Sequence, residues 1–166
     1  MSLTELSYEE LKQEFIEELK KQRTGVLATS DGEDVTARYM LLFSDGLTLY
    51  CFTGKESRKY KQMSVNPKVS FAAGNFQIDG TVTLKGHLLD KENARFIEIH
   101  KEQNPEYFKI TETVFFPNQN ARVVEITPKR IAKWISGGKL DLLNIVKGKA
   151  YRFENLGESP EPEYYE

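Results

Sequence analysis

Two neighbouring cations, Arg58 and Lys59, follow a serine at the start of a short helical pattern, where they could bind an anion. The strand-like run that ends at Thr53 leads through Ser57 into Tyr60–Val65, which Asn66-Pro67 then stops. Ser57 is a good N-cap, so both cations fall in the first turn, where each opposes the helix macrodipole by roughly 0.3–1 kcal/mol. An anion bound to the free N–H groups of that turn would make the position of the two cations favourable. The spacing therefore predicts a phosphate site, although such a composition is also typical of a solvated helix face.

A third cation, Arg38, stands in the mostly apolar run 35–43, which is predicted to be a strand. A half-buried arginine needs an anionic partner. We expect adjacent hairpin strands to place Arg38 beside the loop that offers Ser57, Arg58 and Lys59.

Composition excludes several function classes. The chain has 166 residues, 39% hydrophobic and 29% charged, which suits one soluble domain with a real core. A net charge of −2 argues against nucleic-acid binding, and no apolar run approaches a membrane span. One cysteine, Cys51, fits a reducing cytoplasmic location, and with His87 and His100 it has no metal-ligand spacing.

The order of elements predicts the fold class, which is mainly β with flanking helices. Tight Asp31-Gly32 and Asp45-Gly46 turns separate the first strands, and Gly80 and Gly86 are expected to be bulges or bends. We expect an antiparallel, closed or partly closed barrel of six or more strands, formed by residues 1–154 as a single domain with an N-terminal helix. Residues 155–166 are expected to be a flexible tail. The predicted strands are 25–30, 35–43, 47–53, 68–74, 77–88 and 122–127, with a further apolar alternation at 128–136, and the predicted helices are 8–23, 58–65, 91–100 and 106–115.

An ordered set of short motifs resembles the pyridoxamine 5′-phosphate oxidase-like family, whose fold is the FMN-binding split β-barrel. Each piece is weak by itself, but all appear in the family's order between about residues 24 and 138. The motifs are Val26-Leu27-Ala28-Thr29, Ala37-Arg38-Tyr39-Met40-Leu41-Leu42, Phe52-Thr53 with Ser57-Arg58-Lys59, Asn66-Pro67-Lys68-Val69-Ser70, Val82-Thr83-Leu84-Lys85-Gly86 and Trp134-Ile135-Ser136-Gly137-Gly138.

The resemblance implies a homodimer that binds FMN at the subunit interface. The residues matching Arg38, Arg58 and Lys59 would hold the phosphate and the adjacent ring edge, beside Ser57. The backbone of Tyr39, Met40 and Leu41 would lie along the isoalloxazine ring, with Phe52 and Thr53 nearby. Trp134 resembles the aromatic residue that reaches the flavin from the partner subunit.

Departures from the family pattern bear on the reaction. The oxidase has a lysine where this chain has Phe43, and a flavin-contacting glutamine where it has Thr81. The oxidase's Arg/His substrate clamp corresponds to Leu140 and Leu142. Leucines cannot hold a phosphorylated substrate by charge, so pyridoxamine phosphate oxidation is not expected. The chain is more similar to the general stress protein and nitroimidazole-reductase-like branches.

The resemblance implies an FMN-dependent oxidoreductase that passes electrons from a nicotinamide donor to a small acceptor such as a quinone, a nitro compound or oxygen. No side chain is an evident general acid or base, so the catalytic residues remain unassigned. Two alternatives stay open: a flavin-binding stress or sensor protein without turnover, and the same fold binding haem or a deazaflavin.

Overall fold

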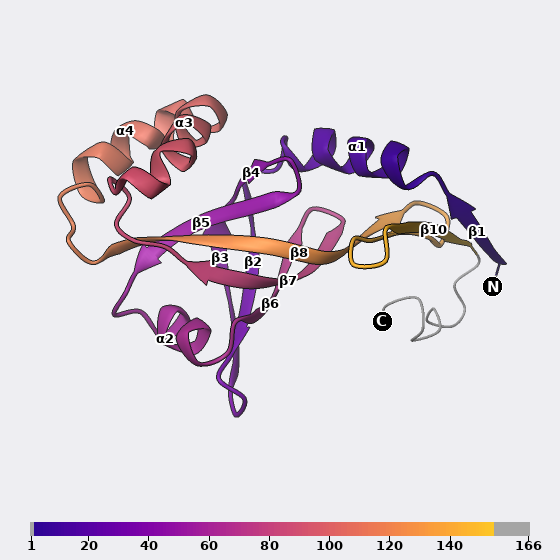
Figure 1. Cartoon of the computed structure of the whole chain (residues 1–166), viewed down its shortest axis with the longest axis horizontal. Helices are drawn as coiled ribbons and strands as arrows, with labels where there is room; N and C mark the ends of the chain where they lie inside the picture. The colour runs from indigo at the N-terminus through magenta and orange to yellow at the C-terminus, as the bar shows by residue number, and fades with distance from the viewer. Residues whose placement is uncertain (1, 155–166) are drawn as a thin grey trace.

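Ten strands, all paired antiparallel, and four α-helices make up residues 2–154, the part of the chain that the computed structural model describes (Figure 1). The main sheet has the order β1-β10-β9-β8-β7-β6-β2-β3, and β5 joins it through β8, with β4 paired to β5. The strands are β1 (Ser2–Leu6), β2 (Thr24–Ser30), β3 (Val35–Leu41), β4 (Phe43–Asp45), β5 (Thr48–Gly54), β6 (Lys68–Ala73), β7 (Phe76–Leu84), β8 (Ala121–Ile135), β9 (Lys139–Asn144) and β10 (Lys149–Glu154). The helices are α1 (Tyr8–Leu19), α2 (Arg58–Val65), α3 (Ala94–Gln103) and α4 (Pro105–Val114), with a 3-10 turn at Lys91–Asn93. The predicted class, an antiparallel split barrel with flanking helices, is confirmed.

The long strand β8 divides the sheet. Its first half pairs with β5 and its second half with β9 on one edge, while β7 follows its other edge. Pro128 lies between the halves, where a residue without an N–H is tolerated. Opposite it, the pairing passes from Asp79–Arg130 to Gly80–Pro128, so Lys129 of β8 is the extra residue of a bulge, and the irregularity predicted at Gly80 is confirmed. A Cβ on Gly80 would meet the Thr127 carbonyl oxygen at 2.5 Å, which explains why glycine stands there.

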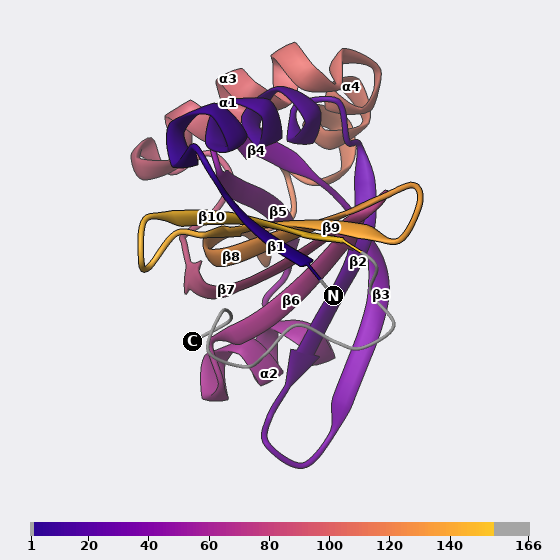
Figure 2. The same ribbon diagram turned by 90° about the vertical axis from the view of Figure 1, so that its right-hand side faces the viewer.

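Three apolar clusters form the core, the smallest of them made by Ala132, Leu140, Leu142 and Phe153. The largest one fills the barrel beneath α1 and includes Phe15, Leu27, Phe71, Ile78 and Val124. The second lies under α3 and α4, where Phe43, Phe52 and Phe96 pack with Leu88, Ile99, Ala121 and Val123. Figures 1 and 2 show α3 and α4 over the same end of the sheet, with α2 on the opposite side. The pair of helices is thus anchored to β4, β5 and β8 by packed rings.

Local signals placed several boundaries correctly, although α1, predicted to continue to Arg23, ends at Leu19. Ser7 caps α1 by accepting from the Glu10 N–H at 3.4 Å, Asn104-Pro105 separates α3 from α4, and Gly137-Gly138 forms the turn between β8 and β9 with positive φ at both glycines. The predicted flexible tail, 155–166, lies outside the described residues.

Several predicted boundaries were wrong. The strand expected at 35–43 is divided at Leu42 into β3 and β4, because the Leu42 N–H bonds to the Arg23 carbonyl instead of a neighbouring strand. The strand expected at 77–88 ends at Leu84, so Gly86 lies in a loop, where its N–H bonds to Glu92. The runs 122–127 and 128–136 are one strand, and β1, β9 and β10 were not predicted at all.

Candidate functional site

A concave pocket of about 430 Å³ lies where β3, β5, α2 and the α4 segment meet. Its only Lys, Arg, His, Asp or Glu side chain is Lys59, so we call it the Lys59 pocket. Six of the ten predicted site residues line it, together with four residues that were not predicted. The lining consists of Thr24, Tyr39, Met40, Leu41, Phe52, Thr53, Gly54, Lys59, Tyr107 and Phe115.

The first turn of α2 forms one end of the site. Ser57 has extended backbone angles, and its hydroxyl accepts from the Tyr60 N–H at 3.3 Å, as expected of an N-cap. The Thr53 and Ser57 hydroxyl oxygens lie 3.1 Å apart. The first turn contains no acidic residue, and of its two cations Lys59 lines the pocket. This end offers donors to an anion.

Arg38 is half-buried and bonded only to neutral groups. Its Nη1 donates to the Leu27 carbonyl at 3.2 Å and to the Thr29 hydroxyl at 2.7 Å, and its Nη2 donates to Thr36. None of the ion pairs found in residues 2–154 involves Arg38 or Lys59. The pKa of Arg38 is lowered by burial and then by Arg58, and that of Lys59 by burial and then by Arg38. The structure therefore brings together positive charges that no carboxylate neutralises by direct contact.

Gln62, on the buried side of α2, is the residue that brings Arg38 to the helix. Its Oε1 accepts from the hydroxyls of Thr29 at 2.7 Å and Thr36 at 2.6 Å, and its Nε2 donates to the Asp34 carbonyl at 3.3 Å. The expected route, pairing of the Arg38 strand with the strand ending at Thr53, was wrong, because β3 pairs with β2 and β5 pairs with β4 and β8. The sequence signal that could have revealed this link is Gln62 itself, a polar residue on the buried face of the predicted helix.

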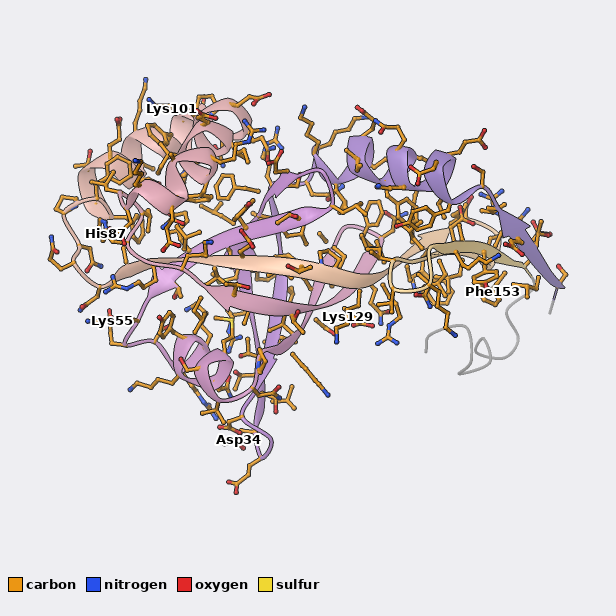
Figure 3. All side chains as sticks on the ribbon, viewed as in Figure 1. Asp34, Lys55, His87, Lys101, Lys129 and Phe153 are labelled. Atoms are coloured by element: carbon orange, nitrogen blue, oxygen red, sulfur yellow. The ribbon has the colours of Figure 1, made fainter. Side chains whose placement is uncertain are left out.

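Arg58 differs from the other two cations because it forms an ion pair with a carboxylate. Its Nη2 lies 3.0 Å from Asp34 Oδ2, and both side chains are largely exposed. Figure 3 shows Asp34 near the tip of the β2–β3 hairpin, next to α2. Arg58 thus ties the hairpin to the helix, and its charge is shared with a carboxylate.

Trp134 lies on the second half of β8, away from the Lys59 pocket of its own chain. Its backbone N–H and carbonyl both bond to Asn75, and its side chain is 49% exposed. It is therefore free to contact another molecule but does not line this pocket.

The positions that depart from the family pattern are mostly buried. Phe43, Leu140 and Leu142 are each no more than 1% exposed and belong to packed clusters. Thr81 is half-buried in β7, opposite Lys68 of β6. None of the four lines the Lys59 pocket. The two leucines thus supply neither charge nor surface to a substrate.

Two aromatic residues of the α4 segment, Tyr107 and Phe115, complete the pocket, and sequence reasoning missed them. The Phe115 ring packs edge-on against Phe52, with centroids 5.0 Å apart. Tyr107 stacks on the buried His100 at 6.4 Å. The only signal was an aromatic-rich helical segment, and periodicity cannot say which face of that segment meets a distant strand.

Other reactive side chains in residues 2–154 are not placed for chemistry. Cys51 is fully buried, which raises the pKa of its thiol to about 12. No group of His, Cys, Asp or Glu in the described chain could hold a metal ion. Nor is any helix there long and apolar enough to cross a membrane.

Comparison with known proteins identifies the family. Residues 11–135 match the pyridoxamine 5′-phosphate oxidase family. General stress protein 26 of Bacillus subtilis is 35% identical over 69 residues, which cover 42% of this chain and about half, 49%, of that protein. A pyridoxamine 5′-phosphate oxidase-like protein from Listeria innocua, known from its crystal structure, is 27% identical, with a TM-score of 0.57 over 73% of this chain and 95% of its own. A haem-binding protein from Mycobacterium smegmatis shares the fold at 15% identity, with a TM-score of 0.62 over 82% of this chain and 57% of its own. The chain therefore belongs to the pyridoxamine 5′-phosphate oxidase family.

Proposed function

We propose that this protein is an FMN-binding oxidoreductase that passes electrons from a nicotinamide donor to a small acceptor. The observation that carries the proposal is the pair of half-buried cations, Arg38 and Lys59, at the N-terminus of α2. Neither makes an ion pair within residues 2–154, and Lys59 lies beside a pocket whose other lining residues are uncharged.

The cationic end suits the phosphate of FMN. After burial, Arg38 is the main cause that lowers the pKa of Lys59, and Arg58 likewise lowers that of Arg38, so a bound dianion would relieve repulsion among these cations. The hydroxyls of Thr53 and Ser57 and the free N–H groups of the first turn add hydrogen-bond donors. Charge, donors and position thus agree on a phosphate monoester.

The opposite end suits a flat ring. Met40, Leu41 and Phe52 provide apolar surface. Within the described sheet β3 is an edge strand, paired only with β2, so its second edge keeps backbone donors and acceptors available. Such a row of groups can bond the polar edge of an isoalloxazine ring.

The strength of the phosphate contacts argues for a dimer. Because Arg58 is bonded to Asp34, two cations remain, and at roughly 1.5–3 kcal/mol each they contribute about 3–6 kcal/mol. Micromolar affinity needs about 8 kcal/mol after ordering costs, so burial of the ring must supply the rest. The exposed residues of β3, Val35 at 75% and Tyr39 at 83%, lie on one face and are suited to contact a second copy. We infer a homodimer in which a partner covers the ring and its tryptophan at position 134 reaches it.

The chemistry would come from the cofactor. Bound FMN would supply the transfer of a hydride from a nicotinamide to an acceptor; a quinone gains two electrons and two protons, one of them from solvent, to become a quinol. The residues of this chain bind and orient the ring. A pyridoxamine phosphate substrate would find no second cationic site in the Lys59 pocket, so we propose that the acceptor is a different molecule.

Haem is the second candidate, because a haem-binding protein shares the fold. The lining of the Lys59 pocket contains no histidine or cysteine, and His100 is completely buried, so Met40, Tyr39 and Tyr107 are the lining residues that could ligate iron. We place FMN first because the cations at the N-terminus of α2 suit its phosphate.

The test is an absorption spectrum of the protein as purified, followed by titration of the stripped protein with FMN and, separately, with haemin. We expect flavin bands, saturable FMN binding, bleaching by NADH or NADPH without oxygen, and re-oxidation by a quinone or nitro compound. Flavin binding without bleaching would instead identify a non-catalytic flavin sensor. A Soret band with no FMN binding would refute the proposal.

A further inference from the structure

We propose that Tyr107 and Phe115 form an aromatic wall that selects a flat aromatic electron acceptor, of the quinone or nitroaromatic class. The inference rests on the proposed function and extends it from the cofactor to the acceptor. It assigns a role to the segment between β7 and β8, which is not part of the barrel sheet.

The wall lies opposite the charged end of the Lys59 pocket. Thr53, Gly54 and Lys59 come from the β5–α2 side, whereas Tyr107 and Phe115 come from α4 and the residue after it (Figure 1). Met40, Leu41 and Phe52 also line the pocket. A molecule bound beyond a flavin ring would thus meet aromatic side chains and no charged one.

Packing holds the wall in position. Phe115 rests edge-on against Phe52, with an interplanar angle of 76°. His100, 0% exposed, lies at 22° to the Tyr107 ring, and its Nε2 is 2.9 Å from the Thr111 hydroxyl. Asn104 caps α4 by accepting from the Tyr107 N–H at 3.3 Å. The two wall rings are therefore preorganised rather than free to turn, which lowers the entropic cost of stacking a ligand on them.

Chemistry favours an aromatic ligand over other small acceptors. Aromatic side chains prefer to stack on other rings or meet them edge-on, and such pairs add to the burial of apolar area. A diatomic oxidant would not need a wall of this size. A carboxylated or phosphorylated acceptor would find no cation on this side of the pocket, because the lining's one charged residue is Lys59.

The test uses the FMN-loaded protein and menadione, a quinone, as the probe. Menadione is titrated into the oxidised protein without a nicotinamide donor, and its Kd is read from the change in the flavin spectrum. The variants are Tyr107→Ala, Phe115→Ala, and the milder Phe115→Leu, which keeps apolar volume and removes the ring. Ile110→Ala is the control, because Ile110 is an exposed residue of the same helix outside the pocket lining.

We expect the Kd for menadione to rise about tenfold in each wall variant. The Kd for menadione should stay unchanged in Ile110→Ala. It should also stay close to that of the unsubstituted protein in Tyr107→Phe, which keeps an aromatic ring at this position. The Kd for FMN, measured separately by fluorescence quenching, should rise by a smaller factor than the Kd for menadione. An unchanged Kd for menadione in folded wall variants overturns this inference alone. Equal losses of FMN and menadione affinity also overturn it, because the wall would then hold the cofactor. Absence of FMN binding in the unsubstituted protein overturns the proposed function and this inference together.

Discussion

Nη1 of Arg38 lies 2.7 Å from Oγ1 of Thr29, a hydroxyl that in turn donates to Gln62 of α2 at 2.7 Å. The charge of a strand residue is thereby held beside a helix N-terminus by neutral partners alone. This arrangement keeps the guanidinium oriented while leaving its charge available to an anion.

Replacing Arg38 with alanine should weaken FMN binding more than it weakens the fold. Loss of one charge-assisted contact of about 1.5–3 kcal/mol corresponds to a roughly 10- to 150-fold rise in Kd. Fluorescence quenching of FMN measures the Kd, and thermal unfolding checks stability. Arg95→Ala is the control, since it removes an equal charge that is bonded to Asp45 on the surface. Equal FMN affinity in Arg38→Ala and the parent protein would reject the phosphate role.

Binding of FMN should weaken at alkaline pH through Lys59. Burial, and then Arg38, lowers the pKa of this lysine in the free protein, while a bound phosphate favours its charged form. Binding therefore takes up a proton, and affinity falls as the pH rises through the lowered pKa of free Lys59. A Kd series from about pH 7 to about pH 10 should show this fall, and Lys59→Arg should keep its affinity over the same range, because arginine stays charged. A parallel fall in both proteins would assign the effect to another group.

Disrupting the exposed face of β3 should release both the partner and the cofactor. Ala37 is exposed between Val35 and Tyr39, so Ala37→Arg is tolerated in a monomer but buries an unpaired charge in a dimer. We expect light scattering to report a monomer and FMN occupancy to decrease with it. Ile110→Arg, an exposed site on α4, serves as the matched control. A dimeric Ala37→Arg protein with full occupancy would contradict the placement of the interface.

His100 should make the fold less stable in acid. Burial among aromatic rings lowers its pKa, so between that lowered value and about 6.5 the unfolded chain binds more protons than the folded one. The free energy of unfolding should therefore fall as the pH drops through this range, by at most about 1.4 kcal/mol per pH unit for the single proton. Urea unfolding measured from about pH 7 to about pH 5 should show that the free energy of unfolding depends less steeply on pH in His100→Phe than in the parent protein. His87→Gln keeps His100, so it should keep the parent slope; if it flattens the curve instead, the assignment is wrong.

Breaking the ion pair between Asp141 and Arg152 should destabilise the fold more than breaking any other ion pair in the described part of the chain. Asp141 is 0% exposed, and both of its carboxylate oxygens lie 2.7 Å from the Arg152 guanidinium, which raises the pKa of Arg152. Arg152→Ala leaves a buried charge unpaired, at a cost of about 3 kcal/mol. Denaturant unfolding should register this loss. The double variant Asp141→Leu with Arg152→Leu should regain most of the stability lost in Arg152→Ala, because no charge is left buried. A double variant as unstable as Arg152→Ala would show that the unpaired charge of Asp141 is not the cause of the loss.

Local rules were enough for much of the fold. Ser57, Asn66-Pro67 and Asn104-Pro105 delimit their helices through backbone hydrogen bonds within a few residues, and Gly80 marks a bulge that its neighbours require. Strand β9 was not predicted, for two reasons. Five of its six residues are buried, so its sequence lacks the alternation of apolar and polar residues that indicates a strand, and Asp141 interrupts its apolar run.

The candidate site divides in the same way. By itself the sequence determined the cationic end, since the positions of Arg58 and Lys59 follow from one cap on one helix, and it indicated that Arg38 needs an anion. Only the tertiary structure decided that Gln62 links the Arg38 strand to that helix, that Arg58 is engaged by Asp34, and that Tyr107 and Phe115 close the pocket. The physical reason is the separation along the chain of the residues that interact. Caps and turns are set by hydrogen bonds between near neighbours in the chain, whereas a pocket wall depends on which side chains the packing of distant segments brings together.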